Sequence, residues 1–77
     1  MQTAFVLINT ETDSSIADVL KDLKKVEGVD EAFAVYGVYD IITKVRAESM
    51  DKLKEIVTCS IRRIDKVRTT LTMTVAE

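Results

Sequence analysis

The segment VDEAFAVYGVYDIITKVR, residues 29–46, decides the fold, because it holds two strand-like runs that meet at Gly37-Val38. Glycine as the first of two turn residues is typical of a type II′ β-hairpin. Such a turn sets an aromatic pair, an aromatic–aliphatic pair and an oppositely charged pair across the strands: Tyr36–Tyr39, Phe33–Ile42 and Glu31–Lys44. Because pairs of these kinds stabilise antiparallel strands, the segment predicts a hairpin, with a longer turn as the alternative.

Helical patterns lie on both sides of this hairpin. Before it, apolar residues at helical spacing predict a helix, and they are Ile16, Val19, Leu20, Leu23 and Val26. Its candidate N-caps are Asp13, Ser14 and Ser15, and Gly28 stands where a C-cap glycine is expected. After the hairpin, Ser49 is the expected N-cap of a second helix. The apolar stripe of that helix is Met50, Leu53, Ile56, Val57, Ile61 and Ile64.

Strand patterns stand near both ends of the sequence. Residues 3–9, TAFVLIN, are apolar on both faces of a strand, so both faces should be covered. Residues 67–75, VRTTLTMTV, alternate strictly, which predicts a strand with two different faces. We expect one face to carry Val67, Thr69, Leu71, Met73 and Val75, and the other to carry Arg68, Thr70, Thr72 and Thr74.

The elements follow the order strand, helix, strand, strand, helix, strand. This order predicts an α+β, ferredoxin-like βαββαβ fold in a single domain, residues 1–77, with a four-stranded antiparallel sheet and two helices on one face. The other face would then expose a large apolar surface, which soluble monomers rarely do. We therefore expect a homodimer in which two sheets pack face to face as a dimeric α/β barrel-like assembly. The alternative is a monomer with a partly apolar open face.

The composition excludes several classes of function. The 77 residues carry a net charge of −2, so the chain lacks the basic surface of a nucleic-acid-binding protein. The absence of histidine excludes imidazole metal sites and histidine-dependent nucleophiles within the chain. The single cysteine, Cys59, cannot form an internal disulfide, and we expect it to be inert. Since no apolar run is long enough for a membrane span or a signal peptide, we expect a cytoplasmic protein that keeps its N-terminus and contacts no membrane. We also expect no cofactor.

The hairpin VYGVYDIITKV, with glycine and aspartate spaced as Gly37-x-x-Asp40, resembles the effector (RAM) domain of the Lrp/AsnC transcription regulators. The resemblance runs from TAFVLIN to TTLTMTV. The departure is that the first strand begins by residue 3, which leaves no room for the helix-turn-helix of full-length members, so the chain looks like a stand-alone RAM protein. The resemblance implies a dimer formed through the open sheet face, a ring of dimers that often has eight subunits, and amino-acid ligands bound where dimers meet.

A free amino acid is a zwitterion, so its site needs an acceptor for the ammonium group and donors for the carboxylate. Asp40 can accept from the ammonium group, and Gly37, which lacks a Cβ, lets a ligand approach the backbone closely. The other ligand-binding candidates are Tyr36, Tyr39, Thr69, Thr70 and Thr72. Each also has a simpler explanation: a turn glycine, an aspartate that bonds turn amides, tyrosines that pack in the hairpin, and threonines that favour strands.

No set of residues in the sequence forms a recognisable catalytic centre, because the carboxylates are scattered and there is no glycine-rich phosphate loop. We predict a regulatory module, not an enzyme, that senses a small effector, an amino acid by the resemblance. Lacking a DNA-binding part, it would act on transcription by associating with a full-length Lrp/AsnC regulator. The alternatives are a small dimeric enzyme of the ferredoxin-like type and an assembly subunit without a ligand.

Overall fold

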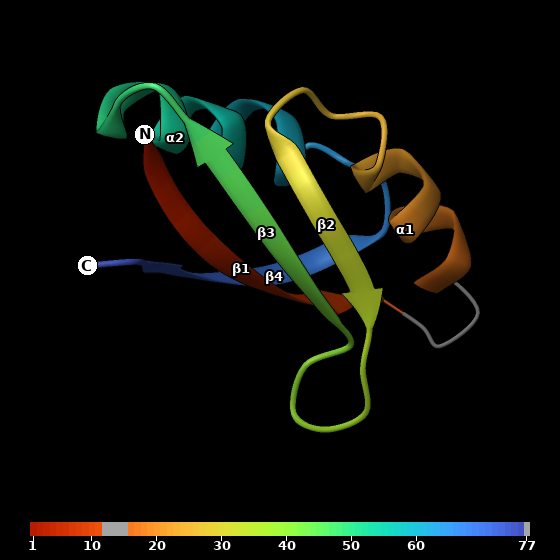
Figure 1. Cartoon of the computed structure of the whole chain (residues 1–77). Coiled ribbons are helices and arrows are strands. Elements are labelled where there is room, and N and C mark those ends of the chain that lie inside the picture. The colour runs from red at the N-terminus through yellow and green to blue at the C-terminus, as the bar shows by residue number, and fades with distance from the viewer. Residues whose placement is uncertain (12–15, 77) are drawn as a thin grey trace.

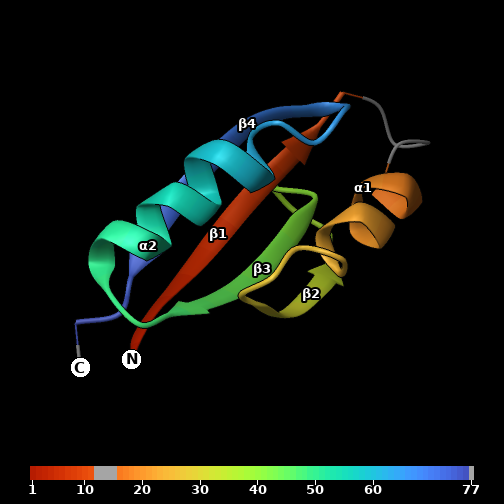
Figure 2. The ribbon, with the colours of Figure 1, turned by 90° about the horizontal axis from the view of Figure 1, so that it is seen from above.

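Four strands form one antiparallel sheet in the order β2-β3-β1-β4. The computed structural model describes residues 1–11 and 16–76. Along the chain it contains β1 (Gln2–Thr10), α1 (Ile16–Leu23), β2 (Val29–Ala34), β3 (Ile41–Ala47), α2 (Met50–Glu55), the π-helical segment η2 (Ile56–Ile61) and β4 (Val67–Thr74). The helices lie on the same side of the sheet (Figures 1 and 2). The predicted ferredoxin-like arrangement is confirmed.

The core lies between the helices and one face of the sheet. Alternate residues of β1 supply its centre and have no exposed surface: Ala4, Val6 and Ile8. Val19 and Leu23 of α1 pack onto them from the helical layer. The second helical region adds Leu53, Ile56, Val57 and Ile61. These are the apolar stripes that the sequence predicts, so helical periodicity locates the core correctly.

The opposite face of the sheet carries apolar side chains that the helices do not cover. Phe5 of β1 pairs with Lys44 on one side and Met73 on the other, and Leu7 pairs with Ile42 and Leu71 in the same way. The side chains on this face that are 36% to 52% exposed are Phe5, Phe33, Leu71, Met73 and Val75. We call this surface the open face. It is the uncovered apolar surface that the two-layer prediction requires.

The hairpin between β2 and β3 has the predicted register but not the predicted turn. Phe33 pairs with Ile42 and Glu31 with Lys44, as expected. The strands end at Ala34 and begin again at Ile41, and only the bond from the Val35 amide to the Asp40 carbonyl, 2.8 Å, continues the pairing. A two-residue type II′ turn at Gly37-Val38 is therefore wrong. A longer loop forms because the Asp40 amide bonds the Ile8 carbonyl of β1 at 3.0 Å instead of closing the turn.

Gly28 does not cap the first helix. That helix ends at Leu23, and Gly28 lies directly before β2 with φ of +100°. A Cβ at this position would stand 2.6 Å from Cδ1 of Ile56 and 3.1 Å from the Arg46 carbonyl oxygen. The glycine is therefore required by a close approach between this turn, β3 and the second helical region. The proposed N-caps Asp13, Ser14 and Ser15 lie outside the described residues.

Ser49 caps α2 as predicted, and its hydroxyl accepts a hydrogen bond from the Lys52 amide at 3.2 Å. The helix continues into η2, where the Arg62 amide bonds the Val57 carbonyl five residues earlier.

In β4 the prediction that Val67 shares a face with Thr69 is wrong. The register against β1 shifts between Asn9 and Thr10, and this bulge turns Val67 toward the core.

The two ends of the chain lie at the same end of the sheet. The amide of Val75, just beyond β4, bonds the carbonyl of Thr3 near the start of β1 at 2.8 Å. Both views show the N- and C-terminal ends on one side of the molecule, away from the loop that joins β2 to β3 (Figures 1 and 2).

Candidate functional site

Asp40 is fixed by the strand next to it. Its Oδ2 accepts hydrogen bonds from the backbone amide of Thr10 at 2.9 Å and from the Thr10 hydroxyl at 3.2 Å. Thr10 is only 5% exposed, so these bonds are partly shielded from water. The carboxylate therefore joins the β2–β3 loop to the end of β1, a longer-range role than bonding the amides of its own turn. We call this end of the sheet, residues 35–40 with 9–10 and 67–70, the loop end.

The tip of the loop projects away from the fold. Tyr36 is fully exposed and Val38 is 84% exposed, whereas Tyr39 is half-buried. Gly37 has φ of +149°, and nothing lies within 4 Å of the position that a Cβ would take. Gly37 is therefore needed for its backbone conformation, not for a close approach within this chain.

The structure brings two of the three candidate threonines to the loop end. The Asn9 side-chain amide donates to the Thr69 hydroxyl at 3.3 Å, and the Arg62 guanidinium Nε donates to the Thr70 hydroxyl at 3.1 Å. Both threonines border a hollow of about 320 Å³ that Arg62 and Arg68 also line. Thr72 pairs with Val6 in the middle of the strand, so this chain does not place it beside Asp40.

Within one chain, the loop end is an unfinished site. It offers a carboxylate, several hydroxyls and the Arg68 guanidinium, with Arg62 beside it, but its most exposed residues face solvent. A ligand held between Asp40 and the loop tip would have protein on one side only. Ligand pockets normally bury most of the ligand, so further walls must come from another molecule if this end binds one.

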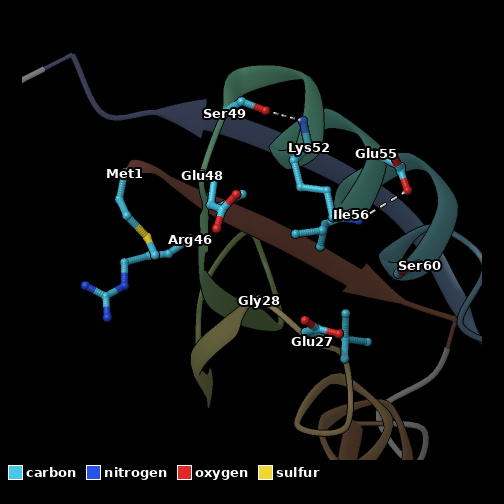
Figure 3. A pocket seen from close by; sticks show the side chains of 12 residues that line it. Met1, Glu27, Gly28, Arg46, Glu48, Ser49, Lys52, Glu55, Ile56 and Ser60 are labelled. Atoms are coloured by element: carbon cyan, nitrogen blue, oxygen red, sulfur yellow. Dashed lines mark hydrogen bonds and ion pairs between the residues drawn. The ribbon is translucent and has the colours of Figure 1, made fainter.

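A second hollow lies at the opposite end of the sheet, where Ala47 pairs with Gln2. It has a volume of about 800 Å³ and sits between the start of α2 and the turn before β2 (Figure 3). Its lining residues are Met1, Val26, Glu27, Gly28, Arg46, Ala47, Glu48, Ser49, Lys52, Glu55, Ile56 and Ser60. We call this region the pocket end. Its volume falls within the range of typical small-molecule sites.

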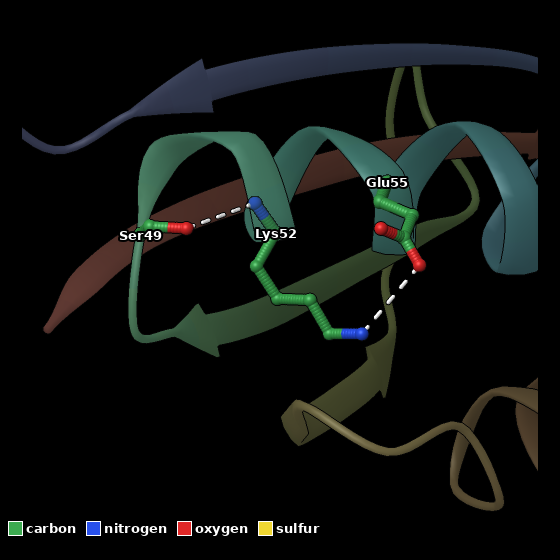
Figure 4. Close-up of polar contacts among 3 residues, drawn as sticks. All are labelled: Ser49, Lys52 and Glu55. Carbon is green, nitrogen blue, oxygen red and sulfur yellow. Dashed lines mark hydrogen bonds and ion pairs between the residues drawn. The ribbon is translucent and has the colours of Figure 1, made fainter.

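The polar groups of the pocket end are only partly paired. The Lys52 ammonium lies 3.5 Å from the Glu55 carboxylate, on an exposed helix face (Figure 4). Nε of Arg46 pairs with Asp30 at 3.2 Å, and its guanidinium points away from Lys52 and Glu55 of the pocket (Figure 3). Glu27 and Glu48 form no hydrogen bond or ion pair with any residue that the structure describes.

Sequence reasoning misses the pocket end. Its walls come from four segments that are distant in the chain: the N-terminus, the turn before β2, the end of β3 and the second helical region. The one local signal is Gly28, whose positive φ and tight contact with Ile56 set the spacing between two of these walls. The sequence alone explains that glycine equally well as a helix cap.

Among residues 1–11 and 16–76, no group of three potential ligands is placed to hold a metal ion. In the same part of the chain, no helix has the length and apolar character needed to cross a membrane.

A model of the Lrp/AsnC ligand binding domain matches residues 3–77. An uncharacterized HTH-type transcriptional regulator of Pyrococcus furiosus is 40% identical over 73 residues, which cover 92% of this chain and 49% of the relative. The chain therefore spans about half the length of such regulators. A homocitrate synthase of Saccharolobus islandicus is 38% identical over 68 residues, which are 86% of this chain but 14% of the enzyme.

Solved structures agree with the match to this family model. The crystal structure of FFRP-DM1 superposes with a TM-score of 0.91 at 35% identity, covering 97% of this chain and 99% of that one. A feast or famine regulatory protein of M. tuberculosis, complexed with L-methionine, has a TM-score of 0.83 at 26% identity and covers 100% of this chain and 51% of that one.

Proposed function

The chain belongs to the family of Lrp/AsnC ligand-binding domains, and we propose that it senses a free amino acid at sites that form only when subunits assemble. The observation that carries this proposal is the loop end, where Asp40 is held in place but the ligand-facing side is left open. A structural relative from M. tuberculosis is complexed with L-methionine, which supports an amino acid as the effector class.

Assembly begins with a homodimer formed through the open face. Five large apolar side chains there are at least 36% exposed, and a chain of 77 residues gains much of its stability by covering such a surface. A second copy presents the same surface, as a two-fold interface requires. The exposed loop tips then serve as contacts between dimers and build a ring, with eight subunits as the expected size.

The ligand site lies where dimers meet. Asp40 accepts from the effector ammonium through Oδ1, since Oδ2 already accepts from Thr10. The backbone at Gly37 approaches the ligand, and its neighbours Tyr36 and Tyr39 form the wall. Thr69 and Thr70 contribute hydroxyls from the same end of the sheet. Thr72 takes part only if a neighbouring subunit brings its strand to the seam.

The output is a contact with another protein. With a net charge of −2, the chain is poorly suited to bind DNA directly. A full-length Lrp/AsnC regulator in the cytoplasm is the partner we propose, since it presents the same dimerising surface. The effector then acts on transcription by changing how readily mixed assemblies form.

The experiment is a thermal-shift screen of the standard L-amino acids, followed by native mass measurement with each hit. A sensing role predicts that one or a few amino acids raise the Tm and also change the number of subunits, because ligand and assembly are linked. If no amino acid changes either quantity, the proposal is wrong.

A second candidate partner follows from the likeness to part of a homocitrate synthase. The same domain type then serves a biosynthetic enzyme, and this chain would bind and regulate an enzyme instead of a DNA-binding regulator. Affinity capture under effector-free and effector-saturated conditions separates the two, because each predicts a different class of captured protein.

A further inference from the structure

We propose that the pocket end is a second small-molecule site, complete within one subunit, and that its ligands are small zwitterions of the α-amino acid class. The choice of amino acids as the ligand class rests on the proposed function, but the site itself does not. It lies at the other end of the sheet from Asp40 and uses none of the loop-end residues.

The pocket has groups of both signs for the two ends of a zwitterion. Glu27 and Glu48 carry carboxylates without partners among the described residues and can accept from an ammonium group. Lys52 extends from α2 over the pocket, and its exposed pair with Glu55 at 3.5 Å is weak enough to be exchanged for a ligand carboxylate.

The pocket also offers neutral hydrogen-bond donors to a zwitterionic ligand. The Ser49 oxygen already accepts from the Lys52 amide at 3.2 Å, so its hydroxyl proton is free to be donated. Ser60 adds a second hydroxyl from η2. The segment η2 is π-helical, as the bond from the Arg62 amide to the Val57 carbonyl shows. Such π-helical turns occur often at functional sites.

The side chain of such a ligand would lie against apolar surface. Val26, Ala47 and Ile56 line the pocket between its charged groups. The absence of a side chain at Gly28 lets Ile56 stand where a Cβ would overlap it, which keeps the turn and the helix close together. A volume of about 800 Å³ accommodates any standard amino acid with room for water.

The test uses calorimetry and hydrogen–deuterium exchange on the full chain, with each standard L-amino acid as the probe. The informative variant is the double substitution Glu27→Gln and Glu48→Gln. We expect a hit to slow exchange in residues 26–28 and 46–60, and the variant to weaken that binding about tenfold or more, because it removes charge-assisted bonds. Asp22→Asn with Asp65→Asn is the matched control, since it changes net charge equally outside the pocket and should leave affinity unchanged.

The variant Asp40→Asn separates this site from the loop end. Binding that persists in Asp40→Asn but falls in the double variant supports the pocket site, even if the loop end binds nothing. Protection confined to residues 9–10, 35–40 and 67–70, or binding that the double variant leaves unchanged, overturns the pocket site while leaving the proposed function intact. If no amino acid binds at the loop end or at the pocket end, both proposals are overturned.

Discussion

The loop end and the pocket end differ in how much of a binding site one subunit contains. At the loop end Asp40 is fixed by Thr10, but Tyr36 and Val38 face solvent. At the pocket end, charges of both signs and apolar side chains from one subunit line a half-open hollow of about 800 Å³. A site that is complete only on assembly reports the oligomeric state as well as the ligand, whereas a site within one subunit responds to ligand alone. The loop end would therefore respond to both the ligand concentration and the oligomeric state, and the pocket end to the ligand concentration alone.

The strongest way to break this comparison is to remove the dimer. Leu71→Glu places a charge on the open face, opposite Leu7, and burying it between two sheets would be costly. We expect monomers in analytical ultracentrifugation, loss of amino-acid binding at the loop end and retention at the pocket end.

The matched control for that variant is Thr72→Glu. Thr72 is exposed one residue further along β4, on the other face of the sheet, and pairs with Val6. The same charge at this position should leave the dimer intact. If both variants dissociate, or if neither does, the open face is not the dimer interface.

Two glycines with positive φ sharpen the comparison, since one lies at each end. Gly28→Ala forces a Cβ against Ile56 and the Arg46 carbonyl, in addition to backbone strain, so we expect it to lower the free energy of unfolding by about 2–4 kcal/mol. Gly37→Ala meets open space and should lose only the strain contribution. Urea denaturation measures both, and equal losses would show that the close approach at Gly28 contributes nothing.

Substitutions of Asp40 test how firmly the loop end is held in place. Asp40→Ala removes the two hydrogen bonds that the carboxylate accepts from the partly buried amide and hydroxyl of Thr10, and we expect a loss of about 1–3 kcal/mol in the free energy of unfolding. Asp40→Asn keeps an acceptor oxygen and should recover most of that loss. An unchanged Tm in Asp40→Ala would contradict the role of this carboxylate in joining β1 to the loop.

The smallest effect is expected midway between the ends. The hydroxyl of Thr43 in β3 is buried and has no hydrogen-bond partner among the described residues. Thr43→Val preserves the shape and should stabilise the fold by about 1 kcal/mol. Binding at both ends should be unchanged, so a change in affinity at either end would mean that the sheet transmits strain between them.

Local patterns account for the parts of the fold that the sequence predicts correctly. The register of β2 and β3 follows from pairs such as Phe33–Ile42, which lie close in sequence and need no other information. Helical stripes likewise locate the core from residues three or four apart. These relations are contained within single elements or a single hairpin.

Long-range contacts account for what the sequence does not predict. The β2–β3 loop is longer than its turn residues suggest, because Asp40 bonds Ile8 and Thr10 of a strand thirty residues away. The bulge in β4 and the position of Gly28 similarly depend on β1 and Ile56. Of the candidate residues, Asp40, Thr69 and Thr70 lie at one end of the sheet, and their role in binding remains a prediction. The pocket end requires four separate segments and has no local signature.

The bond between Val75 and Thr3 has a practical consequence for anyone who builds on this scaffold. Because it holds the two termini together, a fluorescent reporter or an affinity tag fused at either one projects from the same side and leaves Tyr36 and its loop unobstructed. The same fusion would crowd Met1, which lines the 800 Å³ hollow. Tagged preparations are therefore suited to studying ring assembly, and ligand measurements on that hollow call for a cleavable tag.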